Sequence, residues 1–179
     1  MKKSVLLILV VAIIVCASAV GGTVAWLVDR AIVTNTFVVG SISIVLTETT
    51  GSSYQLIPGA TVQKDPKLTV KHDSEACWLF VKVEKTNDFD SYLHYTIADG
   101  WTEYADGVYY RLFDSVSSVD VTYSIIKDDA VTVKDGLTEA QMSALKASGA
   151  YPSLKFTAYA VQKSGVSSAQ DAWEIVNKS

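Results

Sequence analysis

Hydrophobic and polar residues divide the chain into an apolar start and a long segment of short alternating runs. Residues 5–20 are almost wholly apolar, and no charged side chain occurs between Lys3 and Asp29. Beyond residue 36, apolar and polar residues alternate over short stretches rich in Val, Thr, Tyr and Ile. A period of two is typical of β-strands that bury one face. The pattern therefore predicts a mainly β protein that follows an apolar N-terminal segment.

The run at residues 76–84 shows this alternation most clearly. One face of the predicted strand is small or aliphatic, with Cys77, Leu79, Val81 and Val83. We expect this face in the core, where the Cys77 thiol would be buried and inert. Trp78 and Phe80 fall on the other face, and we expect a loop or helix of the same chain to cover them, because large exposed apolar patches are uncommon.

Further strands are expected in five places: residues 37–46, from residue 61 with a break at Pro66, 93–97, 108–113 and 151–163. Asp106-Gly107 predicts a hairpin turn before the fourth of these. Asp128-Asp129 predicts a second hairpin, which would join residues 120–127 to residues 130–133. Pro58-Gly59 predicts a turn, and residues 86–91 read as a polar loop.

Two short helices interrupt the β pattern. Thr138 and Gln141 form a capping box that begins the first helix, and Gly149 ends it. The second helix begins near Ser167 or Ser168. Many short strands with few helices predict an antiparallel β-sandwich with two short helices. We therefore expect one domain over residues 26–179, with an N-terminal arm at 26–35 and a helical insert at 137–149.

The first residues have the layout of a secretory signal peptide. Lys2 and Lys3 precede the apolar run, and small residues follow it. Cleavage after Thr23-Val24-Ala25 would leave Trp26 as the first residue, whereas cleavage after Ala17-Ser18-Ala19 would leave Val20. The run is also long enough to span a bilayer as a retained anchor. We favour a cleaved signal peptide over residues 1–25, because a retained helix needs no small-residue exit.

Charge and cysteine content describe the exported part. The whole chain has a formal net charge of −4. Removing residues 1–25 would take away two lysines and leave 13 basic and 19 acidic residues, a formal charge of −6. An acidic surface argues against nucleic acid as a partner. Cys77 would be the one cysteine left in this part, so no internal disulfide could form.

The sequence resembles the TasA/camelysin family of Gram-positive surface and biofilm-matrix proteins. The resemblance begins at the processing region and extends over most of the exported part. The matching segments are 21–29 (GGTVAWLVD), 34–40 (TNTFVVG), 56–59 (LIPG), 64–70 (KDPKLTV), 78–83 (WLFVKV), 101 with 106–110 (W, DGVYY) and 157–162 (TAYAVQ) with Ala169, Ala172 and Trp173. Trp26-Leu27 and the turn at residues 71–75 depart from the family pattern.

The resemblance implies a jelly-roll-like sandwich and a path to the cell exterior. It implies a signal peptidase of the SipW type as a partner, with Thr23, Ala25 and Trp26 at the cleavage site after Ala25. It also implies self-association into fibres on the cell surface or in the biofilm matrix, with other matrix proteins as further partners. The protein would contact a membrane only before cleavage.

Catalytic chemistry is weakly represented in the sequence. A zinc peptidase of the His-Glu-x-x-His type needs two histidines one helical turn apart, and His72 and His94 lie in separate segments. We therefore expect no catalytic, cofactor-binding or metal-binding residue.

The hypothesis from the sequence is an exported structural subunit that assembles through its arm by donor-strand exchange. The residues expected to act in assembly are Trp26, Leu27, Val28, Ile32 and Val33. Two alternatives stay open at this point: a camelysin-like surface metallopeptidase, and a monomeric membrane-anchored surface protein.

Overall fold

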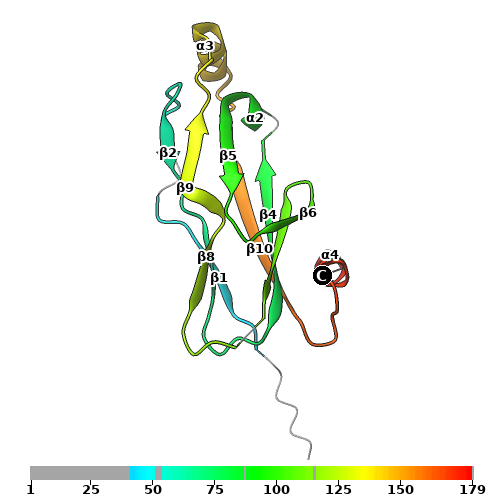
Figure 1. Ribbon diagram of the computed structural model, residues 1–179. Helices are drawn as coiled ribbons and strands as arrows, with labels where there is room; N and C mark the ends of the chain where they lie inside the picture. Colours follow the sequence, from blue (N-terminus) through cyan, green and yellow to red (C-terminus); the bar gives the residue numbers. More distant parts are fainter. Residues whose placement is uncertain (1–40, 51–53, 87, 115, 179) are drawn as a thin grey trace, which may run out of the picture. The chain divides into compact units, whose positions relative to one another are not determined.

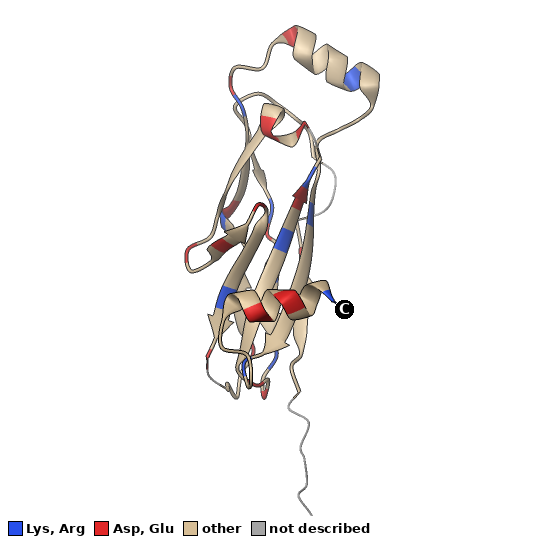
Figure 2. Cartoon of the chain, turned by 90° about the vertical axis from the view of Figure 1, so that its right-hand side faces the viewer, with Lys and Arg blue, Asp and Glu red and all other residues tan. Residues whose placement is uncertain are grey.

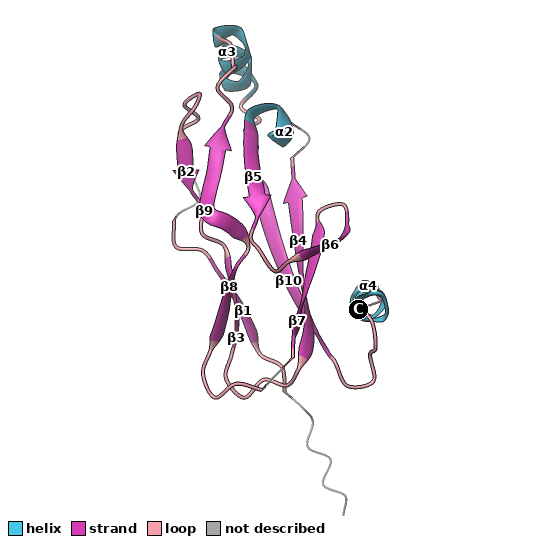
Figure 3. Cartoon of the chain, viewed as in Figure 1, coloured by secondary structure: helices cyan, strands magenta, loops and turns pink. Residues whose placement is uncertain are grey.

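The computed structural model describes residues 41–50, 54–86, 88–114 and 116–178 (Figure 1). Within these residues the chain is mainly β, with antiparallel strands in three sheets and three short helices (Figure 3). The predicted fold class is confirmed at this level. The predicted N-terminal helix and the beginning of the strand at residues 37–46 lie outside the described residues.

The sheets are named after one of their strands. The β1 sheet has the order β1 (Ile44–Thr47), β3 (Lys67–Val70), β8 (Val121–Ser124). The β4 sheet has the order β10 (Leu154–Gln162), β4 (Cys77–Lys85), β7 (Val108–Phe113), β6 (Thr102–Ala105). The β9 sheet has the order β2 (Thr61–Gln63), β9 (Ile126–Val133), β5 (Leu93–Ile97).

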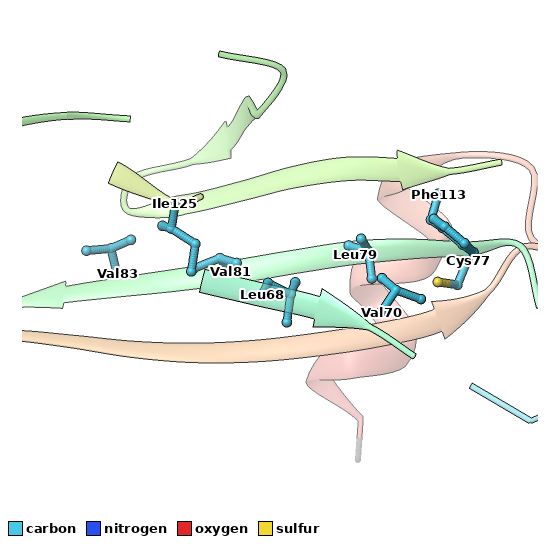
Figure 4. Packing of buried hydrophobic residues seen from close by; sticks show 8 residues of the cluster. All are labelled: Leu68, Val70, Cys77, Leu79, Val81, Val83, Phe113 and Ile125. Carbon is cyan, nitrogen blue, oxygen red and sulfur yellow. The ribbon is translucent and has the colours of Figure 1, made fainter. Parts of the chain in front are cut away.

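The main core lies between the β1 sheet and the inner face of β4 (Figure 4). Leu68 and Val70 of β3 pack with the small and aliphatic face of β4, and all of them are buried. The predicted facing of this strand is therefore confirmed, Cys77 included. Burying such side chains contributes about 1.5–3 kcal/mol each, which makes this contact the main source of stability.

Helix α4 (Ala169–Asn177) covers the outer face of the β4 sheet. Ala172 is fully buried there, and the Trp173 ring lies 5.1 Å from the ring of Phe80. Trp78 also packs in this cluster, and its indole N–H donates to the carbonyl of Val166 at 3.2 Å. The expectation that the chain itself covers Trp78 and Phe80 is confirmed. Ser168, one of the two serines near which the helix was expected to begin, caps it.

The strand broken at Pro66 passes from one sheet to the next. Strand β2, which precedes Pro66, pairs with β9, and strand β3, which follows Pro66, pairs with β8. Fully buried Pro66 has no N–H to donate, but its carbonyl accepts from the N–H of Ile125 at 3.0 Å. The two strands therefore stay together across the junction.

The predicted hairpin at Asp128-Asp129 is wrong. Strand β9 runs through both residues, and the strand before it, β8, pairs with β3 in the other sheet. The register shifts by two residues between the pair Gln63–Ala130 and the pair Lys67–Ser124. Asp128 and Asp129 have positive φ values of 57° and 51°, and they form a two-residue bulge.

The segment at residues 86–91 is not a polar loop throughout. Helix α2 (Phe89–Tyr92) forms there, and Phe89 is only 1 % exposed. Its ring lies edge-on to Tyr95 of β5, with 5.7 Å between the centroids. Tertiary burial of one aromatic side chain thus overrides the polar character of its neighbours.

Three other local predictions are confirmed, whereas the strands expected at residues 37–46 and 151–163 are shorter in the described chain, at Ile44–Thr47 and Leu154–Gln162. Helix α3 (Glu139–Ser148) begins with the Thr138–Gln141 capping box and ends at Gly149, which has a φ of 66°. Strands β6 and β7 form the hairpin at Asp106-Gly107. The turn at Pro58-Gly59 is closed by the N–H of Ala60, which donates to the carbonyl of Ile57 at 2.9 Å. In the described part of the chain, none of the helices is both long and apolar enough to cross a bilayer.

Candidate functional site

The residues predicted for processing and assembly lie outside the part of the chain that the structure describes. These are Thr23, Ala25, Trp26, Leu27, Val28, Ile32 and Val33. The described chain begins after them, at Ser41, and its first hydrogen bonds show which part of the domain its first residues contact.

The first described residues are held beside the turn at residues 71–75. The carbonyl of Ser41 accepts from the N–H of Glu75 at 3.2 Å, and the carbonyl of Ser43 accepts from the N–H of Lys71 at 2.9 Å. The buried hydroxyl of Ser74 accepts from the N–H of Ser43 at 3.2 Å. The described chain therefore begins next to this turn.

The same turn contacts the end of β10. The side-chain amide of Gln162 donates to the carboxylate of Glu75 at 3.2 Å. Strand β1 also contacts β10 directly. The first described residues are thus adjacent to β10, one of the two edge strands of the β4 sheet.

Strand β10 has one free edge among the described residues. It pairs with β4 over nine residues and with no other described strand. Lys155 is its only charged residue, so Phe156–Gln162 is an uncharged edge of seven residues. Natural proteins usually protect such edges with charges, proline or bulges, because an unprotected edge pairs with other chains.

Two hydrogen bonds show which amide groups of β10 face the free edge. The N–H of Lys163 donates to the carbonyl of Ala76 at 2.9 Å, and the N–H of Thr86 donates to the carbonyl of Ser153 at 3.2 Å. In an antiparallel ladder, bonded and non-bonded pairs alternate. The odd-numbered residues of β10 therefore bond to β4. The even-numbered ones direct their N–H and C=O groups toward the free edge: Leu154, Phe156, Ala158, Ala160 and Gln162.

The histidines do not come together in a common site. His72 lies in the turn after β3, and its Nδ1 is 3.0 Å from a carboxylate oxygen of Asp120. His94 lies in β5 of another sheet, with its side chain exposed. Within residues 41–50, 54–86, 88–114 and 116–178, no group of three His, Cys, Asp or Glu side chains is arranged to hold a metal ion.

The buried thiol of Cys77 is held in its neutral form. The residue is fully buried in the main core, and burial raises the pKa of the thiol to about 11. A thiol needs an accessible, electropositive setting to act as a nucleophile. The environment of Cys77 is the opposite of such a setting.

Sequence analysis missed the polar junction around Asp65. Its carboxylate accepts from the hydroxyl of Thr49 at 2.5 Å and from the N–H groups of Thr49 and Thr50 at 2.8 and 3.0 Å. These bonds, that from the Thr49 hydroxyl above all, hold the pKa of Asp65 far below its ordinary value. They attach the segment after β1 to the start of β3, and only the three-dimensional pairing brings these residues together.

Comparisons with models of protein families, with curated proteins and with solved structures gave no match for this chain.

Proposed function

We propose that this chain is an exported structural subunit of cell-surface or biofilm-matrix fibres, of the TasA/camelysin type. Its signal peptide would be removed after Ala25. The freed arm, which begins at Trp26, would then add as a strand to the next subunit. The free edge of β10 carries the proposal, because it is long, uncharged and adjacent to the first described residues, which follow the arm in the sequence.

For the fold we propose a sandwich of the jelly-roll type. The main core supports this, because side chains of the β1 sheet and of the β4 sheet pack together in it. The continuous pairing of β2 and β3 with β9 and β8 supports it further, since one pair of long strands is shared by two sheets.

The side chains near the free edge suit an incoming apolar strand. Phe156, Ala158 and Ala160 of β10 pack against the main core, as do Ile44 and Leu46 of β1. Ala158 and Ala160 are neighbours on the inward face of β10, so the side chains on this part of the face are small. The arm supplies larger ones, because Trp26, Leu27, Val28, Ile32 and Val33 are apolar. Added main-chain bonds would give affinity and these side chains would give fit.

Such a contact would produce open filaments. The donor is the arm of one subunit and the acceptor is the β10 edge of another, so the two contacting surfaces differ. A heterologous contact that does not close on itself yields filaments. Cleavage would control assembly, because the arm of the precursor is continuous with an apolar segment long enough to span the bilayer.

A variant of the full chain that lacks residues 26–33 tests the proposal. The signal peptide and Ala25 stay in place, and Thr34 follows the cut in place of Trp26. N-terminal sequencing of the exported variant checks that it is still cut after Ala25. We expect a folded monomer by size-exclusion chromatography and circular dichroism, with no fibres by electron microscopy, whereas the unaltered chain forms fibres. Fibres that persist after the deletion would rule out the arm. A deletion variant that fails to fold would show that the arm packs on its own domain.

A further inference from the structure

A cavity lies between helix α3 and one end of the β9 sheet. It has a volume of about 1030 Å³, slightly above the range of about 300–1,000 Å³ that is typical of small-molecule sites. Val62, Leu93 and Val131 line it from the three strands of the sheet, and Met142 and Leu145 line it from α3. The lining is therefore mainly apolar and comes from several elements.

Helix α3 forms a preformed wall of this cavity. Leu145 is its one buried residue, so the helix has little packing of its own. Its order comes instead from its ends, where the capping box and the αL residue satisfy the free main-chain groups. Met142 and Leu145 line the cavity from this helix.

Large apolar side chains stay exposed at the opening. Ile57 and Tyr151 both line the cavity, and they are 54 % and 57 % exposed. They come from two segments of the lining, residues 54–57 and 151–154. Apolar residues gathered at the rim of a concave surface are typical of a binding site for an apolar group.

The charges at the cavity are positive, although the chain as a whole is acidic. Lys64 and Lys146 line the cavity, and its described lining residues include no Asp or Glu. Lys64 is already paired with Glu48 at 2.6 Å. Lys146 lies in the last turn of α3, and no carboxylate among the described residues is within ion-pair distance of it. Figure 2 shows α3 with one acidic and one basic position near its two ends.

We propose that this cavity binds an amphipathic anion, a long-chain carboxylate. The hydrocarbon chain would lie along Met142 and Leu145, and the carboxylate would pair with Lys146 at the opening. An apolar cavity alone would accept any hydrocarbon, but an available lysine beside it favours an acidic head group. The site is separate from the arm and does not rest on fibre formation.

Photo-crosslinking of the full chain in membranes from expressing cells tests this inference. The probe is a hexadecanoic acid with a diazirine in its chain, and labelled peptides are identified by mass spectrometry. We expect labels to concentrate on the peptides of Met142, Leu145 and Tyr151. Unlabelled hexadecanoate should compete, and hexadecanol should compete about fivefold less well, in keeping with the loss of one exposed ion pair.

Substitutions of Lys146 give the matched controls. Lys146→Glu should lower labelling of these peptides about fivefold, whereas Lys146→Arg should preserve it. Lys178→Glu, on α4, makes the same change of charge at a lysine outside the cavity lining and should have no effect. Labels spread evenly over the exposed peptides would overturn the inference. Equal competition by the acid and the alcohol, or unchanged labelling in Lys146→Glu, would overturn it too.

Discussion

The main chains of Val83 and Gly107 are joined by a hydrogen bond, in which the N–H of Val83 donates to the carbonyl of Gly107 at 2.7 Å. Gly107 has a φ of 70° in the turn between β6 and β7. A Cβ atom on Gly107 would lie 2.6 Å from the carbonyl oxygen of Val83. The hairpin therefore approaches β4 so closely that only glycine fits without a shift of the backbone.

Gly107→Ala should destabilise the domain by about 2 kcal/mol or more, because the new methyl group adds steric overlap to an unfavourable φ. Chemical denaturation measures this change. Gly136→Ala is the control: nothing lies within 4 Å of its added Cβ, so we expect a change within about 0.5 kcal/mol. Equal effects of the two substitutions would contradict the close approach of Gly107 to Val83.

Val81→Asp should prevent folding. Val81 of β4 is fully buried in the main core, between the β1 sheet and the β4 sheet. An unpaired carboxylate in that position costs more than about 4 kcal/mol, a large part of a domain's stability. Loss of the cooperative thermal transition would show this.

In the unaltered protein, Cys77 should react with a thiol reagent only on unfolding, since its pKa is raised and it is buried. Rapid reaction of the folded protein would contradict the facing of β4.

The local signals in the sequence predicted local structure well. The alternation around Val81 gave both faces of β4, and the Thr138–Gln141 box gave the start of α3. In each case neighbouring residues carry the signal. The pattern at Asp128-Asp129 was ambiguous, because aspartate tolerates a positive φ in a turn and in a bulge alike. Whether a turn or a bulge forms depends on how distant strands pair, and the sequence of this segment carries no information on that pairing.

The candidate site was less accessible to sequence reasoning. Whether β10 is central or at an edge follows from the order of strands, and the run at residues 156–162 reads the same in either place. Similarly, Asp65 accepts hydrogen bonds from Thr49 and Thr50, which precede it in the sequence by 16 and 15 residues. Composition gives no sign of that contact.

Stability should fall in acid partly through Asp65. The pKa of Asp65 is lowered in the folded state from an ordinary value of 3.8. Its contribution is therefore fully present above pH 3.8 and is lost as the pH falls below 3.8 toward the folded-state pKa. Asp65→Asn should be less stable at neutral pH and should lose less stability between pH 5 and pH 3. Denaturation midpoints at several pH values measure both effects.

Thr49→Val is the partner experiment for Asp65. It removes the hydroxyl that contributes most to the lowered pKa but keeps the carboxylate. We expect the same direction of change as in Asp65→Asn, with a smaller size, because the two main-chain N–H donors stay in place. An unchanged acid dependence in both variants would show that Asp65 does not govern the loss of stability.

Ala25→Asp should leave the precursor attached to the membrane. A signal peptidase accepts small side chains before the bond that it cuts, and a charged residue does not fit. Fractionation of expressing cells and N-terminal sequencing of the released protein measure this. Ala19→Asp is the control and should allow release with Trp26 first. Release that begins at Val20 in the unaltered protein would show that the other exit is used.

Ala158→Pro should abolish fibre formation and preserve the folded domain. The N–H of Ala158 points to the free edge of β10, and so it takes no part in the ladder with β4. Proline is tolerated at such edge positions, but it removes a donor that an incoming strand would use. We expect a cooperative thermal transition, a monomer by size-exclusion chromatography and no fibres by electron microscopy.

The control for this prediction is a proline at the edge of another sheet. The carbonyl of Pro66 accepts from the N–H of Ile125, so the same alternation directs the N–H of Thr122 in β8 away from β3. Thr122→Pro should therefore keep the fold, apart from the hydroxyl contact with Thr69, and it should also keep the fibres. Fibres that form with Ala158→Pro would exclude the β10 edge as the acceptor. Their loss in Thr122→Pro alone would place the acceptor at β8 instead.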